Sequence, residues 1–139
     1  MFIPLLMIKN SIVFCLLLIA VNNSAQISKS IMPDAFYNCW LASYEEDEPN
    51  TNIKIYRPCD YKEFKPSMFR QSITYEKNGV CKYLQLSPND AHYFVEGKWI
   101  YNKKKKVVTI KDDKNKDVFK FKIKKLEKTL MKAEFIEPR

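Results

Sequence analysis

The segment Asp117–Lys125 constrains the fold of this chain more than any other part of the sequence. Apolar residues and lysines alternate along it, in the order Phe119, Lys120, Phe121, Lys122, Ile123 and Lys124. Because the side chains of a strand point alternately to its two faces, this order places the apolar groups on one face and the ammonium groups on the other. The pattern predicts a strand that covers an apolar interior and exposes its other face to water.

Several further segments share this two-residue period. The first runs from Phe36 to Glu45, and the others follow one another from Ser67 onward, separated by turn sequences such as Lys77-Asn78-Gly79. We therefore predict seven strands, six of them consecutive. The residues expected on their inner faces, besides those above, are Trp40, Ala42 and Tyr44; Phe69, Ile73 and Tyr75; Val80, Leu84 and Leu86; Tyr93, Val95, Gly97, Trp99 and Tyr101; Val108 and Ile110; and Met131, Ala133 and Phe135.

The stretch between Glu45 and Pro66 is expected to be a long, partly ordered crossing loop. It opens with the acidic run Glu45–Glu48 and contains Pro49 and Pro58. Proline cannot donate a backbone hydrogen bond, so this density of prolines argues against a central strand. Long loops of compact domains often cover a functional site.

These elements predict an all-β fold. Consecutive strands with tight turns form an antiparallel meander, and strands with one apolar face must close on themselves or pack against a second sheet. We expect a small antiparallel up-and-down β-barrel, with a flattened sandwich as the alternative. The length of 139 residues allows one domain, predicted to span residues 26–139.

The first 25 residues have the features of a secretory signal peptide. Their only charged side chain is Lys9, which precedes the apolar run Ile12–Val21 and a small-residue exit at Ala25. The run is shorter than the roughly 20 helical residues that cross a bilayer. We expect cleavage and a secreted or periplasmic location, and an uncleaved anchor that also uses Phe2–Ile8 is the alternative.

Three cysteines follow the predicted signal peptide, namely Cys39, Cys59 and Cys81. An odd number in an oxidising compartment implies one disulfide and one free thiol, or no disulfide. The sequence leaves all three pairings open. No two of these cysteines have the spacing of a zinc or redox motif.

The positive charge is concentrated in the last third of the chain. Residues 26–100 have nine basic and ten acidic side chains, whereas residues 101–139 have fourteen basic and six acidic ones. Lys103, Lys104, Lys105 and Lys106 form an unbroken run at a predicted turn. The run could contact an anionic envelope surface, or it could be a solvated hairpin tip that prevents edge pairing. With only three arginines in the chain, a nucleic-acid partner is not expected.

A tryptophan on the first strand, Trp40, and a later glycine–tryptophan step, Gly97-Lys98-Trp99, resemble the small bacterial lipocalin-like proteins of the calycin group. The segments Phe69-Arg70, Asn78–Leu84 and Pro88–Tyr93 also resemble an uncharacterised set of secreted bacterial proteins with that fold. The resemblance covers roughly Phe36–Ile136. It implies a barrel that binds or carries a small apolar molecule.

The resemblance also implies structural roles for Trp40 and Arg70. An arginine stacked on the first-strand tryptophan would brace one end of such a barrel by a cation–π contact. A salt bridge at the barrel rim is the alternative for Arg70. The chain departs from lipocalins at Asn38, where they have a glycine, and it is shorter than they are.

Five inward aromatic residues are the candidate ligand contacts, because aromatic walls with hydroxyl tips suit an amphipathic ligand. They are Tyr44, Tyr75, Tyr93, Trp99 and Tyr101. The only histidine, His92, lacks the further ligands that a metal site needs, and it follows a turn sequence in which it is expected to begin a strand.

No catalytic motif accompanies these residues, so neither an enzyme nor a cofactor is expected. The predicted function is a secreted or periplasmic binding protein for a small apolar or amphipathic ligand. The alternative is a cell-envelope interaction protein, in which a filled barrel presents a basic outer face to an anionic surface or an acidic protein.

Overall fold

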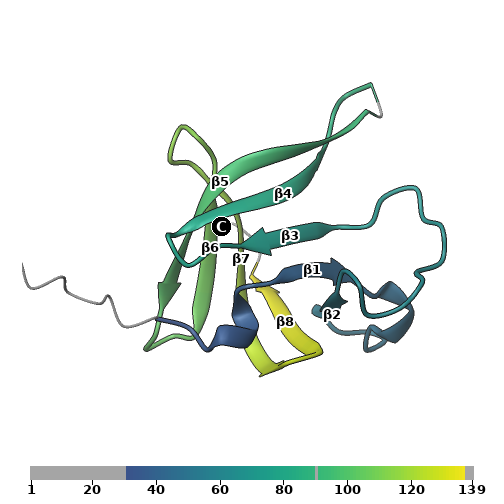
Figure 1. Ribbon diagram of the computed structural model, residues 1–139, viewed down its shortest axis with the longest axis horizontal. Coiled ribbons are helices and arrows are strands. Elements are labelled where there is room, and N and C mark those ends of the chain that lie inside the picture. The colour runs from purple at the N-terminus through teal and green to yellow at the C-terminus, as the bar shows by residue number, and fades with distance from the viewer. Residues whose placement is uncertain (1–30, 90, 137–139) are drawn as a thin grey trace, which may run out of the picture.

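Eight antiparallel strands close into a barrel in the computed structural model, which describes residues 31–89 and 91–136 (Figure 1). Two short 3-10 turns flank the first strand. The elements in chain order are η1 (Asp34–Phe36), β1 (Cys39–Ala42), η2 (Tyr44–Glu46), β2 (Ile53–Pro58), β3 (Ser72–Tyr75), β4 (Val80–Leu86), β5 (His92–Asn102), β6 (Val107–Lys111), β7 (Asp117–Glu127) and β8 (Leu130–Ile136).

The predicted all-β barrel is confirmed, and the meander from β3 to β8 is continuous. The order around the barrel is β1-β2-β8-β7-β6-β5-β4-β3, so β1 lies between β2 and β3. Residues 59–71 carry the chain from the end of β2 to the start of β3. A crossing segment was expected in this region, and its position in the sequence is later than predicted.

Strand β2 was not predicted, because a loop was expected there and seven strands in place of eight. Its six residues pair with β1 on one side and with β8 on the other. Pro58 is the last residue of the strand, where it lies opposite Trp40. A proline at the end of a strand interrupts little of its hydrogen bonding, so the proline argument did not apply here.

The predicted alternation is confirmed on β6 to β8 and on β5 from Val95 to Tyr101, whereas Tyr93 near the start of β5 is exposed. Val108, Ile110, Phe121, Met131 and Ala133 are almost completely buried. A β-bulge between Ile123 and Lys125 then shifts the register of β7. The residues that constrained the fold at the outset therefore form a strand of the barrel wall, with their lysines on the outside.

Three other assignments were wrong. Phe69 was expected on a strand with Ile73 and Tyr75, but β3 begins at Ser72. Tyr44 was expected on the first strand, but β1 ends at Ala42 and Tyr44 begins η2. On β4 the inner residues are Cys81 and Tyr83, where Val80, Leu84 and Leu86 had been predicted. Both faces of β4 carry apolar side chains, so alternation alone could not choose between them.

One end of the barrel is closed by packed aromatic rings. Phe36 of η1 stacks on Tyr75 at a centroid distance of 4.2 Å and lies 5.1 Å from the ring of Trp99. Trp40, completely buried, donates a hydrogen bond from Nε1 to the carbonyl oxygen of Phe36 at 3.1 Å. Trp40 thus packs and bonds at this end, which we call the closed end, without the stacking on Arg70 that the resemblance implied.

A disulfide joins Cys39 on β1 to Cys59 directly after β2, and Cys81 is a buried free thiol. The structure thereby selects one of the three pairings that the sequence left open. The bond fixes the start of β1 against the end of β2, and the amide of Cys59 also donates to the carbonyl oxygen of Cys39 at 3.0 Å.

The predicted signal peptide and the alternative anchor lie outside the described residues. Within the described part of the chain, no helix has the length and apolar character required to cross a bilayer.

Candidate functional site

The end of the barrel opposite the closed end is hollowed, and we call it the mouth. It lies where β2 begins, where the crossing segment meets β3 and where β8 ends. A cavity of about 240 Å³ opens there. Its lining residues are Tyr44, Lys54, Tyr56, Phe69, Gln71 and Phe135.

Hydrogen bonds fix the polar side of the mouth. The hydroxyl of Tyr56 donates to Oε1 of Gln71, and the backbone amide of Gln71 donates to the hydroxyl of Tyr44 at 3.1 Å. Tyr56 is 2% exposed, and burial raises the pKa of its hydroxyl well above the usual value. The hydroxyl thus stays protonated and keeps donating. Among the described residues, no partner is found for the side-chain NH₂ of Gln71, which can therefore donate to a ligand.

Arg70 holds the rim of the mouth. Its guanidinium group donates to both carboxylate oxygens of Glu45, at 2.7 and 3.0 Å, and to the carbonyl oxygens of Ala42 and Lys65. The same group lies 5.3 Å from the ring centre of Tyr44. These contacts tie β1, η2 and the crossing segment together.

The rim salt bridge, one of the two alternatives for Arg70, is therefore the arrangement found. The stacking partners of Arg70 are Tyr44 and Phe64, where the other alternative had placed Trp40. The hydrogen bonds from Arg70 lower the pKa of Glu45 to about 2, so this carboxylate is ionised at any physiological pH.

An apolar hollow adjoins the mouth. It measures about 360 Å³ and shares Phe69 with the mouth cavity, its other lining residues being Met68, Leu86 and His92. Met68 is 94% exposed, and the ring of Phe69 packs edge-on against His92 at 5.7 Å. Phe69 thus separates the two hollows. The surface beside the mouth is apolar, and Met68 exposes its side chain there.

The structure does not gather the five predicted ligand contacts into one place. Tyr44 lines the mouth, whereas Tyr75 and Trp99 are packed in the closed end. Tyr101 is half-buried against the core, and Tyr93 is exposed on the β4–β5 hairpin, which extends beyond its neighbours in Figure 1. Their role in ligand binding stays a prediction, and the geometry shows that a single small molecule cannot contact all five.

Five mouth residues did not appear among the predicted contacts, namely Lys54, Tyr56, Phe69, Gln71 and Phe135. Gln71 and Phe69 immediately precede β3, and Tyr56 lies on the strand that the prolines concealed. Phe135 was predicted to face inward, but no local pattern indicates that β8 closes beside β2. The pairing of β2 with β8 would have identified these residues, because it brings segments about 80 positions apart in the sequence to one end of the barrel.

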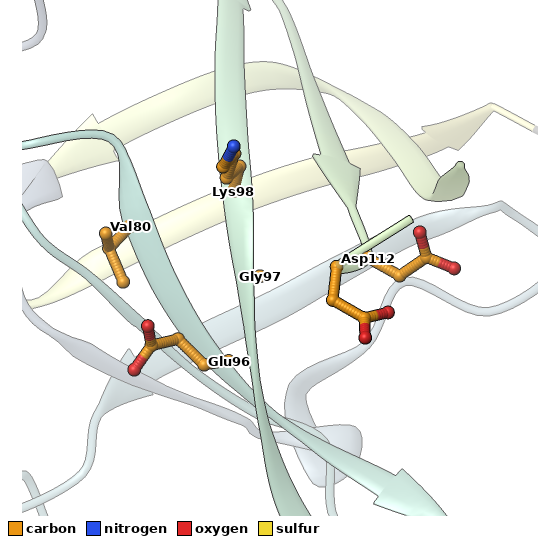
Figure 2. Close-up of a pocket in the computed structure, with 6 residues that line it drawn as sticks. Val80, Glu96, Gly97, Lys98 and Asp112 are labelled. Atoms are coloured by element: carbon orange, nitrogen blue, oxygen red, sulfur yellow. The ribbon is translucent and has the colours of Figure 1, made fainter. Parts of the chain in front are cut away.

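A third hollow, of about 230 Å³, lies on the barrel wall around Gly97. Figure 2 shows Gly97 on β5, with the carboxylates of Glu96 and Asp112 directed to different sides of the strand. Oδ1 of Asp112 accepts hydrogen bonds from the backbone amides of Lys114 and Lys116, at 3.0 and 2.8 Å. This carboxylate stabilises the β6–β7 turn.

Gly97 itself is required by close packing. A Cβ atom at this position would lie 2.4 Å from the carbonyl oxygen of Lys111 and 3.0 Å from the ring of Tyr83. The glycine–tryptophan step noted in the sequence therefore combines a close approach of two strands at Gly97 with a core residue at Trp99. Over residues 31–89 and 91–136, no group of three or more His, Cys, Asp or Glu side chains could hold a metal ion.

The described barrel therefore has packed aromatic rings at its closed end and a hollowed, partly apolar mouth at the other end. Comparison of the chain with protein-family models, with curated proteins and with solved structures gives no match.

Proposed function

We propose that this protein binds a small amphipathic molecule in the mouth of the barrel and does not catalyse a reaction. The observation that carries the proposal is Phe69, a half-buried ring that forms a wall of both the 240 Å³ mouth and the adjoining 360 Å³ hollow. The mouth lies just below, and the adjoining hollow just above, the lower limit of ligand pockets, which occupy about 300–1,000 Å³. A ligand of one or two rings, or a short chain, fits this scale.

The chemistry of the lining supports a ligand with an apolar body and an acceptor oxygen. Phe69 and Phe135 offer apolar surface, and the NH₂ group of Gln71 can donate a hydrogen bond. Lys54 is also present, but its ammonium group is already 3.0 Å from a carboxylate oxygen of Asp47. We therefore expect neutral or weakly acidic ligands to bind similarly.

The interior below the mouth supports a shallow site. Trp40, Tyr56 and Phe121 fill the barrel with almost no exposed surface. Lipocalin-like transport of a ligand deep within a hollow barrel is therefore disfavoured, and the proposed function is capture at the rim. The alternative from the sequence, a basic face that contacts an anionic partner, is compatible with this proposal because Lys103–Lys106 lie at the closed end.

The experiment is a titration with 1-anilinonaphthalene-8-sulfonate, an amphipathic dye whose fluorescence rises in apolar surroundings. We expect saturable binding that Phe69→Ser weakens about tenfold, the effect of losing a ring contact. The matched control is Phe94→Ser, because Phe94 is 64% exposed on β5 and lines neither hollow. Equal effects of the two substitutions, or none from Phe69→Ser, would refute the site, provided that near-UV circular dichroism shows both variants folded.

We also propose export to an oxidising compartment, as predicted from residues 1–25. The Cys39–Cys59 disulfide supports this location, because disulfides persist in secreted and periplasmic proteins and are rare in the cytosol. Mass spectrometry of the isolated protein tests both the removal of residues 1–25 and the presence of the disulfide. We expect a mature N-terminus near residue 26 and one thiol accessible only after unfolding. An intact Met1 would favour the uncleaved anchor, whereas free thiols at both Cys39 and Cys59 would contradict an oxidising compartment.

A further inference from the structure

A lysine occupies a backbone conformation that disfavours it, at the end of the β5–β6 turn. The described residues with positive φ are Gly79 (87°), Asn50 (59°), Asn115 (64°) and Lys106 (55°). Glycine and asparagine are the residues that adopt this region most readily. Lys106 is the exception among the four. Because this backbone conformation is unfavourable for lysine, its presence here indicates a function for the charged side chain.

The lysine run is held as an exposed tip. Lys103, Lys104, Lys105 and Lys106 are all exposed. The side-chain oxygen of Asn102 accepts the backbone amide of Lys105 at 3.0 Å, which stabilises the turn without using any ammonium group.

Strand β7 adds a fifth cation beside this tip. The carbonyl oxygen of Lys106 accepts the amide of Ile123 at 3.0 Å, and Lys122 lies opposite Val107 in the β6–β7 register. Lys122 is also exposed. We call Lys103, Lys104, Lys105, Lys106 and Lys122 the basic tip.

The ion pairs of the surrounding surface make the basic tip distinct. Lys111 and Lys120 both pair with Asp117, and Lys124 pairs with Glu134 at 3.2 Å. No ion pair within residues 31–89 and 91–136 involves a lysine of the basic tip. Most of the β6–β8 surface is thus locally neutralised, and the uncompensated charge is concentrated at one turn.

The basic tip lies at the closed end, where the described chain begins. Phe36 of η1 packs against Trp99 of β5, three residues before the turn residue Asn102, and Figure 1 shows the dark-blue start of the chain near the end of β5. Ile31, the first described residue, is 63% exposed. The mouth is at the opposite end of the barrel, so contact through the basic tip leaves the proposed ligand site open.

The composition of the tip favours a diffuse anionic surface over a single anion. Lysine ammonium groups act as strongly hydrated point charges and lack the planar fork with which arginine grips one phosphate. Clusters of lysines attract the anionic headgroups of a membrane without fixed pairing. We propose that the basic tip docks the barrel onto membranes rich in anionic phospholipid, with the mouth directed away from the bilayer.

The test measures binding of the isolated full-length protein to vesicles of phosphatidylglycerol and phosphatidylcholine, against vesicles of phosphatidylcholine alone. Any apolar N-terminal segment would bind both kinds, so only the difference reports the charge. We expect preference for the anionic vesicles that falls steeply between 50 and 300 mM salt. Equal binding to the two kinds of vesicle would overturn the proposal, as would binding to soluble heparin with no binding to anionic vesicles.

A pair of charge-matched triple variants locates the site. Lys104→Gln, Lys105→Gln and Lys106→Gln together are expected to weaken the anionic-lipid preference at least about tenfold. Lys82→Gln, Lys98→Gln and Lys114→Gln remove the same charge from exposed lysines elsewhere and should change it less than about twofold. Equal losses in the two triples would mean that net charge alone acts and would overturn the assignment of the tip.

A single substitution separates binding from folding. Lys106→Gly relieves the left-handed backbone, so it should raise the unfolding midpoint by about 4 °C while lowering anionic-vesicle binding about threefold. Asn115→Gly is the control, because it changes a similar backbone position without removing charge. Unchanged vesicle binding in Lys106→Gly would overturn the role proposed for this residue, whereas reduced binding by a more stable protein cannot be attributed to unfolding.

Discussion

Arg57 on β2 grips Glu46 of η2 through two hydrogen bonds, from Nη2 to Oε1 at 2.6 Å and from Nε to Oε2 at 3.0 Å. The same carboxylate accepts the hydroxyl of buried Ser43 at 2.7 Å. The hydrogen bonds from Arg57 and then Ser43 lower the pKa of Glu46 to about 2. The loop between β1 and β2 is therefore anchored by a charged group, close to the mouth.

Acid should weaken this anchor. Glu46 is more acidic in the folded than in the unfolded protein, so its contribution to the free energy of unfolding is complete above about pH 4.5 and is lost as the pH falls toward 2. Urea unfolding at a series of pH values should show stability falling in this window. Arg57→Gln should flatten that dependence, leaving the part due to Glu45, and an unchanged slope would show that the pair contributes nothing.

Gly97→Ala should destabilise the barrel strongly. Its new Cβ atom would meet the backbone oxygen of Lys111, which cannot move without displacing β6, and we expect a loss of about 3 kcal/mol. Gly79→Ala is the comparison. There the space is open and only the positive φ is unfavourable, so the cost should be about 1 kcal/mol. Urea midpoints in the reverse order would contradict the close approach at Gly97.

Two buried tyrosines should respond oppositely to removal of their hydroxyl groups. The hydroxyl of Tyr75 has no hydrogen-bond partner in the described structure, so Tyr75→Phe should be neutral or stabilise by about 1 kcal/mol. Tyr56→Phe removes the donor to Gln71 and should destabilise by about 1 kcal/mol. Chemical denaturation of both variants measures the difference, and a marked loss in Tyr75→Phe would reveal a partner for that hydroxyl.

Reduction of the Cys39–Cys59 disulfide should lower the free energy of unfolding by about 3 kcal/mol. The bond closes a loop with a sequence separation of 20, and its main effect is on the entropy of the unfolded chain. Urea denaturation with and without dithiothreitol gives the value. Cys81 provides an internal control, because burial raises its thiol pKa to about 12 and should keep it unreactive toward maleimides until the protein unfolds. Rapid labelling of the native protein would contradict the described core.

Strict alternation made the fold predictable where only one face was apolar. Phe121 on β7 and Ile110 on β6 are flanked by polar side chains, and both are buried as expected. On β4 apolar residues occupy both faces, and the wrong face was chosen there. Which set of alternate residues on a strand is buried depends on the strands that pack across the barrel, and the sequence of one segment does not reveal these strands.

The mouth could not be predicted because it depends on closure. Phe69 and Phe135 come from a crossing segment and from the last strand, which become neighbours only after β2 pairs with β8. The disulfide has the same origin, since Cys39 and Cys59 approach through the register of β1 with β2. By contrast, the lysine run was visible in the sequence, but the backbone conformation that distinguishes Lys106 was not.

The placement of β1 between β2 and β3 has a consequence for assembly. Strands β3 to β8 form a continuous six-stranded sheet, and the β1–β2 hairpin pairs with both of its outer strands, β1 with β3 and β2 with β8. Without the hairpin that sheet would have two unpaired edges, each a template for pairing with another chain. The β1–β2 hairpin thus closes the barrel by pairing with both edges of this sheet. Because the disulfide holds this hairpin together, it should limit self-association as well as unfolding.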